Sequence, residues 1–170
     1  AGFGEAINYS VIGEKDYARI GVATTGDQFI RVANPLTEDA TIMRTTLGCG
    51  LLNNIVWNIN HGNNEVKIFE QGRVFLGKGK NTYANEVNML GLAIAGIRNS
   101  AAWNQARIPA DIFYVKGVLA GLLKSCGLEN IEFRIASDQL YHPALCLEVF
   151  INGEKLGLFG RLATRVMGKY

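Results

Sequence analysis

The chain has 170 residues, 48% of them hydrophobic, and a formal net charge of +2. This length allows one domain that buries most of its apolar surface, and no apolar run is long enough to span a membrane. The basic and acidic residues are interspersed, which argues against a domain that grips nucleic acid on its own, because such a domain carries a clustered basic face.

The first third of the chain predicts two strands joined by a polar connection. Alternating apolar and polar residues favour a strand over residues 5–12. Residues 13–26 are the connection, with one helical turn expected at residues 16–20. A short strand is expected at residues 29–32, and Asn34-Pro35 ends it because the residue before a proline favours extended geometry.

An amphipathic helix follows. Its apolar residues recur at spacings of one, three and four, and asparagines occupy much of the remaining surface. Gly62 ends the helix after His61, because glycine readily takes the left-handed conformation of a C-terminal cap. The apolar stripe consists of Leu51, Leu52, Ile55, Val56 and Ile59.

The rest of the chain predicts an α+β fold, mainly an antiparallel sheet flanked by helices, as one domain over residues 1–170. Asn152-Gly153 separates two apolar runs and is a strong hairpin signal. Neither end of the chain has the features of a natural terminus, so we expect a piece of a longer protein. The expected elements are strands at 66–76 and 88–96, a helix at 111–126, and strands at 131–135, 145–151 and 154–162.

The cysteines and histidines indicate no metal centre. Cys49, Cys126 and Cys146 lie far apart, and neither a Cys-x-x-Cys pair nor zinc spacing with His61 or His142 occurs. We expect small buried thiols in a reducing compartment. The sequence shows no signal peptide, so we expect a cytoplasmic protein.

Six segments, taken in their order and spacing, resemble the catalytic-like core module of the bacterial-type phenylalanyl-tRNA synthetase beta chain. Together they cover nearly the whole chain. The segments are Gly2-Phe3-x-Glu5-Ala6-Ile7-Asn8-Tyr9-Ser10, Arg31-Val32-Ala33-Asn34-Pro35-Leu36, Gly50-Leu51-Leu52 with Asn58-x-Asn60, Val66-Lys67-Ile68-Phe69-Glu70-Gln71-Gly72-Arg73-Val74-Phe75, His142-Pro143, and Ile151-Asn152-Gly153-Glu154-Lys155-Leu156-Gly157-x-x-Gly160.

Three positions depart from the family pattern and bear on loop contacts rather than on the fold. Ala144-Leu145-Cys146 follows His142-Pro143, where the family often has glycine, a basic residue and serine. Ala163-Thr164 stands where a second His-Pro pair is common. Cys49 takes the place of a proline that opens the helix in many members.

The resemblance implies a class II aminoacyl-tRNA synthetase-like fold in a heterotetramer of two alpha and two beta chains. That holoenzyme attaches phenylalanine to its tRNA using ATP and Mg²⁺, and its alpha chain carries out the activation. The beta module would therefore bind no cofactor itself and would reach tRNA only through the holoenzyme. Its region 43–61 would face the alpha chain, with the expected interface residues Met43, Arg44, Leu51, Leu52, Ile55, Trp57 and Asn58.

The residues themselves argue against catalysis by this module. A class II site needs a cation to hold the α-phosphate of ATP, and in the alpha chain an arginine usually follows the Gly-Arg-Val-aromatic strand. Here Gly72-Arg73-Val74-Phe75 is followed by Leu76. Without a positioned cation, the transition state would lose stabilisation on the order of 3 kcal/mol. The final strand also lacks the glycine-rich stretch that ends in an adenine-stacking arginine, since Gly157-Leu158-Phe159-Gly160-Arg161 is at best a remnant of it, so we assign no catalytic residue.

Two further features each have a functional and a structural interpretation. Lys78-Gly79-Lys80 resembles an anion cradle but lacks the phosphate-loop pattern, and lysines beside glycines at a hairpin tip are usually solvated. His142 titrates near neutrality and suits a general base, but a loop histidine before a proline is more often structural.

Arg44 and Glu70 are the pair that we single out. Glu70 shares a strand face with apolar residues, so a buried position requires a partner, and Arg44 is the natural candidate. We expect a structural ion pair that fixes the helix against the sheet, and the alternative is two exposed polar residues. Trp57 and Trp103 suit either a subunit interface or a cap on the domain's own core.

We therefore expect a non-catalytic module that docks the alpha chain. One rival is that the module itself activates an amino acid, and the absence of a cation after Phe75 argues against it. Another is a free-standing paralogue that acts as a small-ligand or regulatory binding protein. The exposed apolar stripe also makes a homodimer of the isolated fragment plausible.

Overall fold

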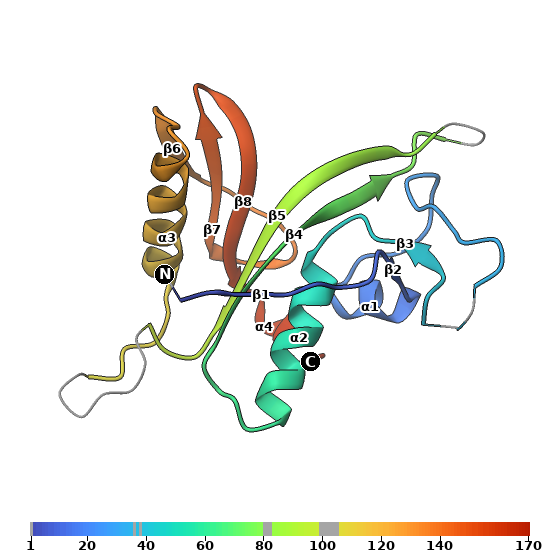
Figure 1. Cartoon of the computed structure of the whole chain (residues 1–170), viewed down its shortest axis with the longest axis horizontal. Helices are drawn as coiled ribbons and strands as arrows, with labels where there is room; N and C mark the ends of the chain where they lie inside the picture. The colour runs from blue at the N-terminus through green and yellow to red at the C-terminus, as the bar shows by residue number, and fades with distance from the viewer. Residues whose placement is uncertain (1, 36, 38, 80–82, 99–105) are drawn as a thin grey trace. The chain divides into compact units, whose positions relative to one another are not determined.

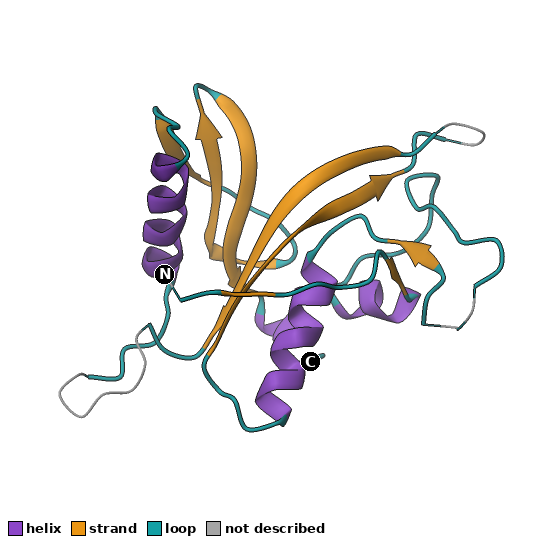
Figure 2. Cartoon of the chain, viewed as in Figure 1, coloured by secondary structure: helices purple, strands orange, loops and turns teal. Residues whose placement is uncertain are grey.

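The computed structural model describes residues 2–35, 37, 39–79, 83–98 and 106–170. The chain divides into two compact units, which we call the N-terminal unit (residues 2–95 with Tyr170) and the C-terminal unit (residues 96–169). Each unit combines helices with strands (Figure 2), and all strand pairings except one are antiparallel among the described residues. The predicted α+β class is confirmed.

The N-terminal unit is built on a long ribbon of two antiparallel strands, β4 and β5, drawn in green in Figure 1. Their register runs from Val66 opposite Ala95 to Leu76 opposite Asn85, and β1 pairs with β4 in parallel. Strands β2 and β3 form a separate antiparallel pair. The elements of this unit are β1 (Gly4–Glu5), β2 (Val11–Ile12), α1 (Glu14–Arg19), β3 (Ile42–Met43), α2 (Gly48–Asn60), β4 (Val66–Leu76) and β5 (Asn85–Ala95).

Helix α2 packs on one face of this ribbon. Leu47, Leu51 and Val74 form the buried centre, and Ala6, Ile68, Val87 and Ala93 surround it. Gly91 makes this packing possible, because a Cβ atom there would lie 2.7 Å from Cδ1 of Leu51. Leu51 of the stripe predicted from sequence therefore lies on the face with which the helix meets its own sheet, whereas Ile59 of the same stripe is 42% exposed.

In the C-terminal unit, α3 covers a three-stranded antiparallel sheet of order β6-β7-β8. Leu123 of α3 packs on Val149 and Phe159. The backbone N–H of Tyr114 donates to the carboxylate of Asp111, which caps the start of the helix. The elements are α3 (Ile112–Ser125), β6 (Ile131–Ile135), β7 (Tyr141–Ile151), β8 (Glu154–Leu162) and α4 (Thr164–Met167).

Local signals placed most elements correctly. The helices expected at 51–61 and 111–126 correspond to α2 and α3, and the strands expected at 66–76 and 131–135 match β4 and β6. The hairpin turn is also confirmed, since Asn152 and Gly153 have φ values of 51° and 84°.

Four expectations were wrong. The strand expected over 5–12 is two short strands, because between the backbone hydrogen bonds of Ala6 and Ser10 the chain is held through Asn8 by the side chains of Glu70 and Arg44. In place of the strand expected at residues 29–32, the structure has an isolated β-bridge between Arg31 and Ile42. Cys126 is exposed, because it caps the last turn of α3. His142 lies within β7 rather than in a loop.

No helix among the described residues is long and apolar enough to cross a membrane.

Candidate docking surface

A buried ion pair anchors the segment that precedes α2. Nη1 of Arg44 lies 2.5 Å from Oε1 of Glu70, and the two side chains are 6% and 3% exposed. Arg44 also donates from Nε to the carbonyl oxygen of Arg73 at 2.9 Å. The backbone N–H of Phe75 donates to the carbonyl oxygen of Arg44 at 2.8 Å. The entrance to α2 is thereby fixed to β4 by side-chain and backbone contacts.

Asn8 completes this network, and sequence analysis did not single it out. Its Nδ2 donates to Oε2 of Glu70 at 2.7 Å, and its backbone N–H donates to Oε1 at 3.2 Å. Its carbonyl oxygen accepts from Arg44 at 3.3 Å. Alternation along an extended segment places Asn8 on the face opposite to Ile7 and Tyr9, but it would predict the apolar pair inward, so no sequence signal pointed to an inward Asn8.

Two glycines leave the space that this network needs. A Cβ atom on Gly50 would lie 2.8 Å from Cγ of Asn8, and one on Gly72 would clash with the guanidinium of Arg44. Gly72 therefore lets Arg44 lie flat against β4, and Gly50 lets the Asn8 side chain lie against the first turn of α2.

Helix α1 is tied to α2 and to the segment before it. Nδ2 of Asn53 donates to the largely buried Asp16 at 3.0 Å. The buried hydroxyl of Tyr17 accepts from the backbone N–H of Thr45 at 2.7 Å. Burial raises the pKa of Tyr17, and the pKa of the buried Cys49 on α2 is raised to about 12 for the same reason. Both groups stay neutral at pH 7.

Three of the residues expected at a subunit interface are buried within the N-terminal unit. Arg44 lies in the ion pair, and Leu51 and Ile55 are 3% and 9% exposed on the inner face of α2. These side chains hold the helix in place, and any partner would touch the opposite side.

The surface that α2 leaves outside the core carries apolar and asparagine side chains and no charge. Trp57 is 61% exposed and Ile59 is 42% exposed, on different sides of the helix, while Leu52 and Asn58 on α2 and Met43 before it are half-buried. The helix contains no Asp, Glu, Lys or Arg in its thirteen residues. A solvated helix normally carries charges on its outer face, and the centres of protein interfaces are depleted of them.

Trp57 is in contact with His61, one turn further along the chain. Its indole stacks on the imidazole of His61 with centroids 3.9 Å apart, and Nδ1 of His61 lies 2.7 Å from the carbonyl oxygen of Trp57. Trp57 and His61 therefore form an exposed pair of stacked aromatic rings at the C-terminal end of α2. Trp103 and Lys80, which the sequence also singled out, lie outside the described residues.

The other candidates are not brought into one site. Arg73 pairs with Glu86 on the surface at 2.9 Å, and Lys78 is exposed. Nδ1 of His142 accepts from the backbone N–H of Ala144 at 3.2 Å. Among the described residues, no group of three or more His, Cys, Asp and Glu side chains is placed to hold a metal ion.

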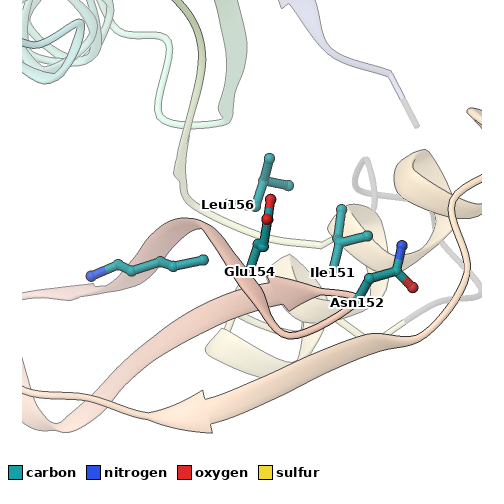
Figure 3. Close-up of a pocket in the computed structure, with 5 residues that line it drawn as sticks. Ile151, Asn152, Glu154 and Leu156 are labelled. Atoms are coloured by element: carbon teal, nitrogen blue, oxygen red, sulfur yellow. The ribbon is translucent and has the colours of Figure 1, made fainter.

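A hollow of about 380 Å³ lies at the tip of the β7–β8 hairpin (Figure 3). Ile151, Glu154 and Leu156 rise from the same side of the hairpin, and Asn152 and Lys155 complete the lining. Lys155 is engaged by Glu148 at 2.6 Å. This lining pairs no nucleophile with a base.

The model of the phenylalanyl tRNA synthetase beta chain CLM domain family matches residues 1–170. The chain belongs to this family. It is 34% identical over 99% of its length to the phenylalanine–tRNA ligase beta subunit of Nitratidesulfovibrio vulgaris, and 33% identical over 97% to that of Hahella chejuensis. It spans about a fifth of each relative, 21% and 20% respectively.

A solved structure shares the fold of this CLM domain. A pyrrolysyl tRNA synthetase from Desulfitobacterium hafniense aligns with a TM-score of 0.65 at 16% identity, covering 91% of this chain and 49% of that one. The likeness is one of fold, and it confirms the expected class II aminoacyl-tRNA synthetase-like architecture.

Proposed function

We propose that this CLM domain is the docking module through which a phenylalanine–tRNA ligase beta subunit binds its catalytic alpha subunit. The assembled enzyme would charge tRNA with phenylalanine in the cytoplasm. ATP and Mg²⁺ would be bound by the alpha subunit, and tRNA would be reached through the holoenzyme. The beta subunit name of the relatives, which implies a multi-subunit enzyme, supports this assignment.

The observation that carries the proposal is the exposed Trp57 on α2, a helix that contains no charged residue. Exposed aromatic residues are the commonest anchors of protein interfaces, and a rigid anchor loses less entropy on binding. The ion pair of Arg44 and Glu70 supplies that rigidity beneath the helix. The buried pair would thus stabilise the module, and the exposed Trp57 would contact the partner.

The end of the Gly-Arg-Val-aromatic strand favours a docking role without catalysis. Leu76 ends β4, and the nearby Arg73 is engaged by Glu86. An adenylate-forming site needs a free cation preorganised for the α-phosphate of ATP. We infer that this module positions the alpha subunit within the holoenzyme and that the alpha subunit carries out the catalysis.

The test uses the complete beta chain and the alpha chain of the same organism. Trp57→Ser removes the exposed anchor without disturbing a buried side chain, and Phe113→Ser on α3 is the matched control, since Phe113 is 75% exposed. Sedimentation velocity over a concentration series should show an affinity at least about tenfold lower for Trp57→Ser, as expected for an interface anchor. Equal affinities for both variants and the parent would contradict the proposal.

The same experiment addresses the alternatives. Self-association of the beta chain that Trp57→Ser abolishes, with no binding to the alpha chain, would indicate a homodimer through α2. ATP–pyrophosphate exchange by the beta chain alone would favour an active synthetase. Absence of any complex would favour a free-standing paralogue that binds a small or regulatory ligand.

A further inference from the structure

Asn152 and Gly153 form the two-residue tip of the β7–β8 hairpin, and theirs is the one Asn-Gly pair in the sequence. Both residues are exposed to solvent, and Figure 3 shows the carboxamide of Asn152 at this tip. Asn-Gly pairs are chemically labile, because the backbone nitrogen of the glycine can attack the side-chain carbonyl carbon of the asparagine. Glycine favours this attack, since it has no side chain to shield its nitrogen and it moves readily between backbone conformations.

The reaction exchanges ammonia for water without any change of oxidation state. The Gly153 nitrogen forms a bond to Cγ of Asn152 and gives its proton to a solvent base. The bond from Cγ to Nδ2 then breaks, and ammonia leaves after taking a proton from water. Water opens the resulting succinimide ring at either of its two carbonyl carbons, which produces aspartate or isoaspartate at position 152. The chain and water supply every group that the reaction needs.

The folded turn holds the two reacting atoms apart. The φ values of 51° and 84° at Asn152 and Gly153 are those of a type I′ turn. The first central residue of such a turn has a ψ of about +30°, the mirror image of a type I turn. This ψ places the Gly153 nitrogen and Cβ of Asn152 on nearly opposite sides of the bond between Cα and the carbonyl carbon, whereas a five-membered ring needs them on the same side. The ring can therefore close only after the turn opens.

Asn130 holds the turn closed through two hydrogen bonds, which we call the Asn130 clamp. Its Nδ2 donates to Oδ1 of Asn152 at 2.9 Å, and its carbonyl oxygen accepts from the backbone N–H of Asn152 at 3.4 Å. The first bond fixes the carboxamide that must be attacked, and the second fixes the main chain beside it. The clamp matters because the register of β7 and β8 shifts between Val149 and Phe150, close to the turn, where the ladder is interrupted.

We propose that Asn152 is a site of spontaneous deamidation in this domain and that the Asn130 clamp restrains it. With the clamp in place, the folded chain reacts only while the hairpin tip is locally open. The reaction adds a negative charge close to Glu154, and in the isoaspartate product the main chain passes through one additional carbon atom. A two-residue turn does not accommodate that atom, so the isoaspartate form loses the register of the tip. This chemistry belongs to the C-terminal unit alone and does not depend on the docking role of α2.

The experiment follows deamidation at about pH 8 in complete beta chains assembled with the alpha chain. Trypsin releases residues 135–155 as a peptide in which Asn152 is the one asparagine, and mass spectrometry of this peptide measures the deamidated fraction. Asn130→Gly removes the side-chain bond of the clamp and suits the φ of 51° at this position. Asn63→Gly is the matched control, because it removes the exposed contact between Asn63 and Asn58 in the N-terminal unit.

The folded Asn130→Gly chain should deamidate at least about threefold faster than the parent, the factor expected for the loss of one neutral hydrogen bond. Asn63→Gly should react at the parental rate. In urea that unfolds the chains, parent and Asn130→Gly should react equally fast, and both faster than the folded parent, because the clamp exists only in the folded state. Hydrogen exchange of the α3 amides should be the same in the three folded chains, which shows that the C-terminal unit stays folded.

Four results would overturn the proposal. The first is an equal rate in the folded parent and in Asn130→Gly. The second is a slower reaction in Asn130→Gly, because the amide of Asn130 would then assist the attack through its bond to Oδ1 of Asn152. The third is no conversion in folded Asn130→Gly over a period in which the unfolded chain reacts completely. The fourth is a faster reaction in Asn130→Gly that an equal rise in α3 exchange accounts for.

Discussion

Nη1 of Arg44 lies 2.5 Å from Oε1 of Glu70, and this pair joins the entrance of α2 to the centre of β4 with both side chains almost fully buried. Neither charge has access to bulk water, so each depends on the other and on Asn8. The pair therefore couples the position of the helix to the sheet beneath it.

Arg44→Met should destabilise the N-terminal unit strongly, because it leaves the carboxylate of Glu70 buried without its cation. We expect a loss of about 3–5 kcal/mol in the free energy of unfolding. The matched control is the double variant Arg44→Met/Glu70→Met, which removes both charges and should lose less. Hydrogen exchange of β4 amides in increasing urea provides the measurement, and an Arg44→Met chain as stable as the parent would contradict the pairing.

Gly50→Ala should destabilise the chain, although alanine is the better helix former. Replacing a glycine inside a helix normally contributes roughly 0.5–1 kcal/mol of stability. At Gly50 the new Cβ would meet Asn8 at 2.8 Å, whereas at Gly117 in α3 nothing lies within 4 Å. We expect opposite signs for Gly50→Ala and Gly117→Ala in thermal unfolding, and equal shifts in melting temperature would count against the Asn8 contact.

Thiol reactivity should follow burial. Cys126 is exposed, whereas Cys49 and Cys146 are buried and burial raises the pKa of both thiols. The thiolate is the reactive form, so an alkylating reagent at pH 8 should modify Cys126 first and the other two only as the chain unfolds. Mass spectrometry of peptides after timed alkylation measures the order, and labelling of Cys49 as fast as Cys126 would refute it.

Stability should fall at alkaline pH through Cys49. Its thiol has a pKa of about 12 in the folded chain and about 8.5 when unfolded, so between these values only the unfolded chain loses the proton. The stability that the folded chain gains by keeping this thiol protonated is fully present below pH ~8.5 and is lost progressively towards pH ~12. Urea unfolding from pH 7.5 to 10.5 should show a shallower decline for Cys49→Ala and an unchanged one for Cys126→Ala. If the free energy of unfolding fell equally with pH in the parent and in Cys49→Ala, the decline would not come from Cys49.

The elements that sequence predicted well are those whose signals are local. Strand β4 shows its period of two over eleven residues, and Gly62 ends α2 with a φ of 83° that glycine adopts freely. The turn at Asn152-Gly153 requires two positive φ values, which few other dipeptides accept. In each case the residues that decide the structure lie within a few positions of it.

What sequence missed depends on distant partners. Strand β1 makes only a short parallel pairing with β4, and the chain beyond it is held by the contact of Asn8 with Glu70, which lie 62 positions apart. Tyr17 and Thr45 meet only because α1 folds against the segment before α2. The apolar stripe was identified correctly, but its orientation was not, since Leu51 and Ile55 face the unit's own core and leave Trp57 outside.

Site-specific photocrosslinking tests the central claim most directly. A benzophenone amino acid placed at position 57 of the complete beta chain reaches whatever covers the outer side of α2, and the same group at position 113 of α3 is the control. The account predicts a crosslink from position 57 to the alpha subunit in the assembled enzyme, lost when the alpha subunit is omitted. Crosslinks from position 57 that remain within the beta chain when both subunits are present would contradict it.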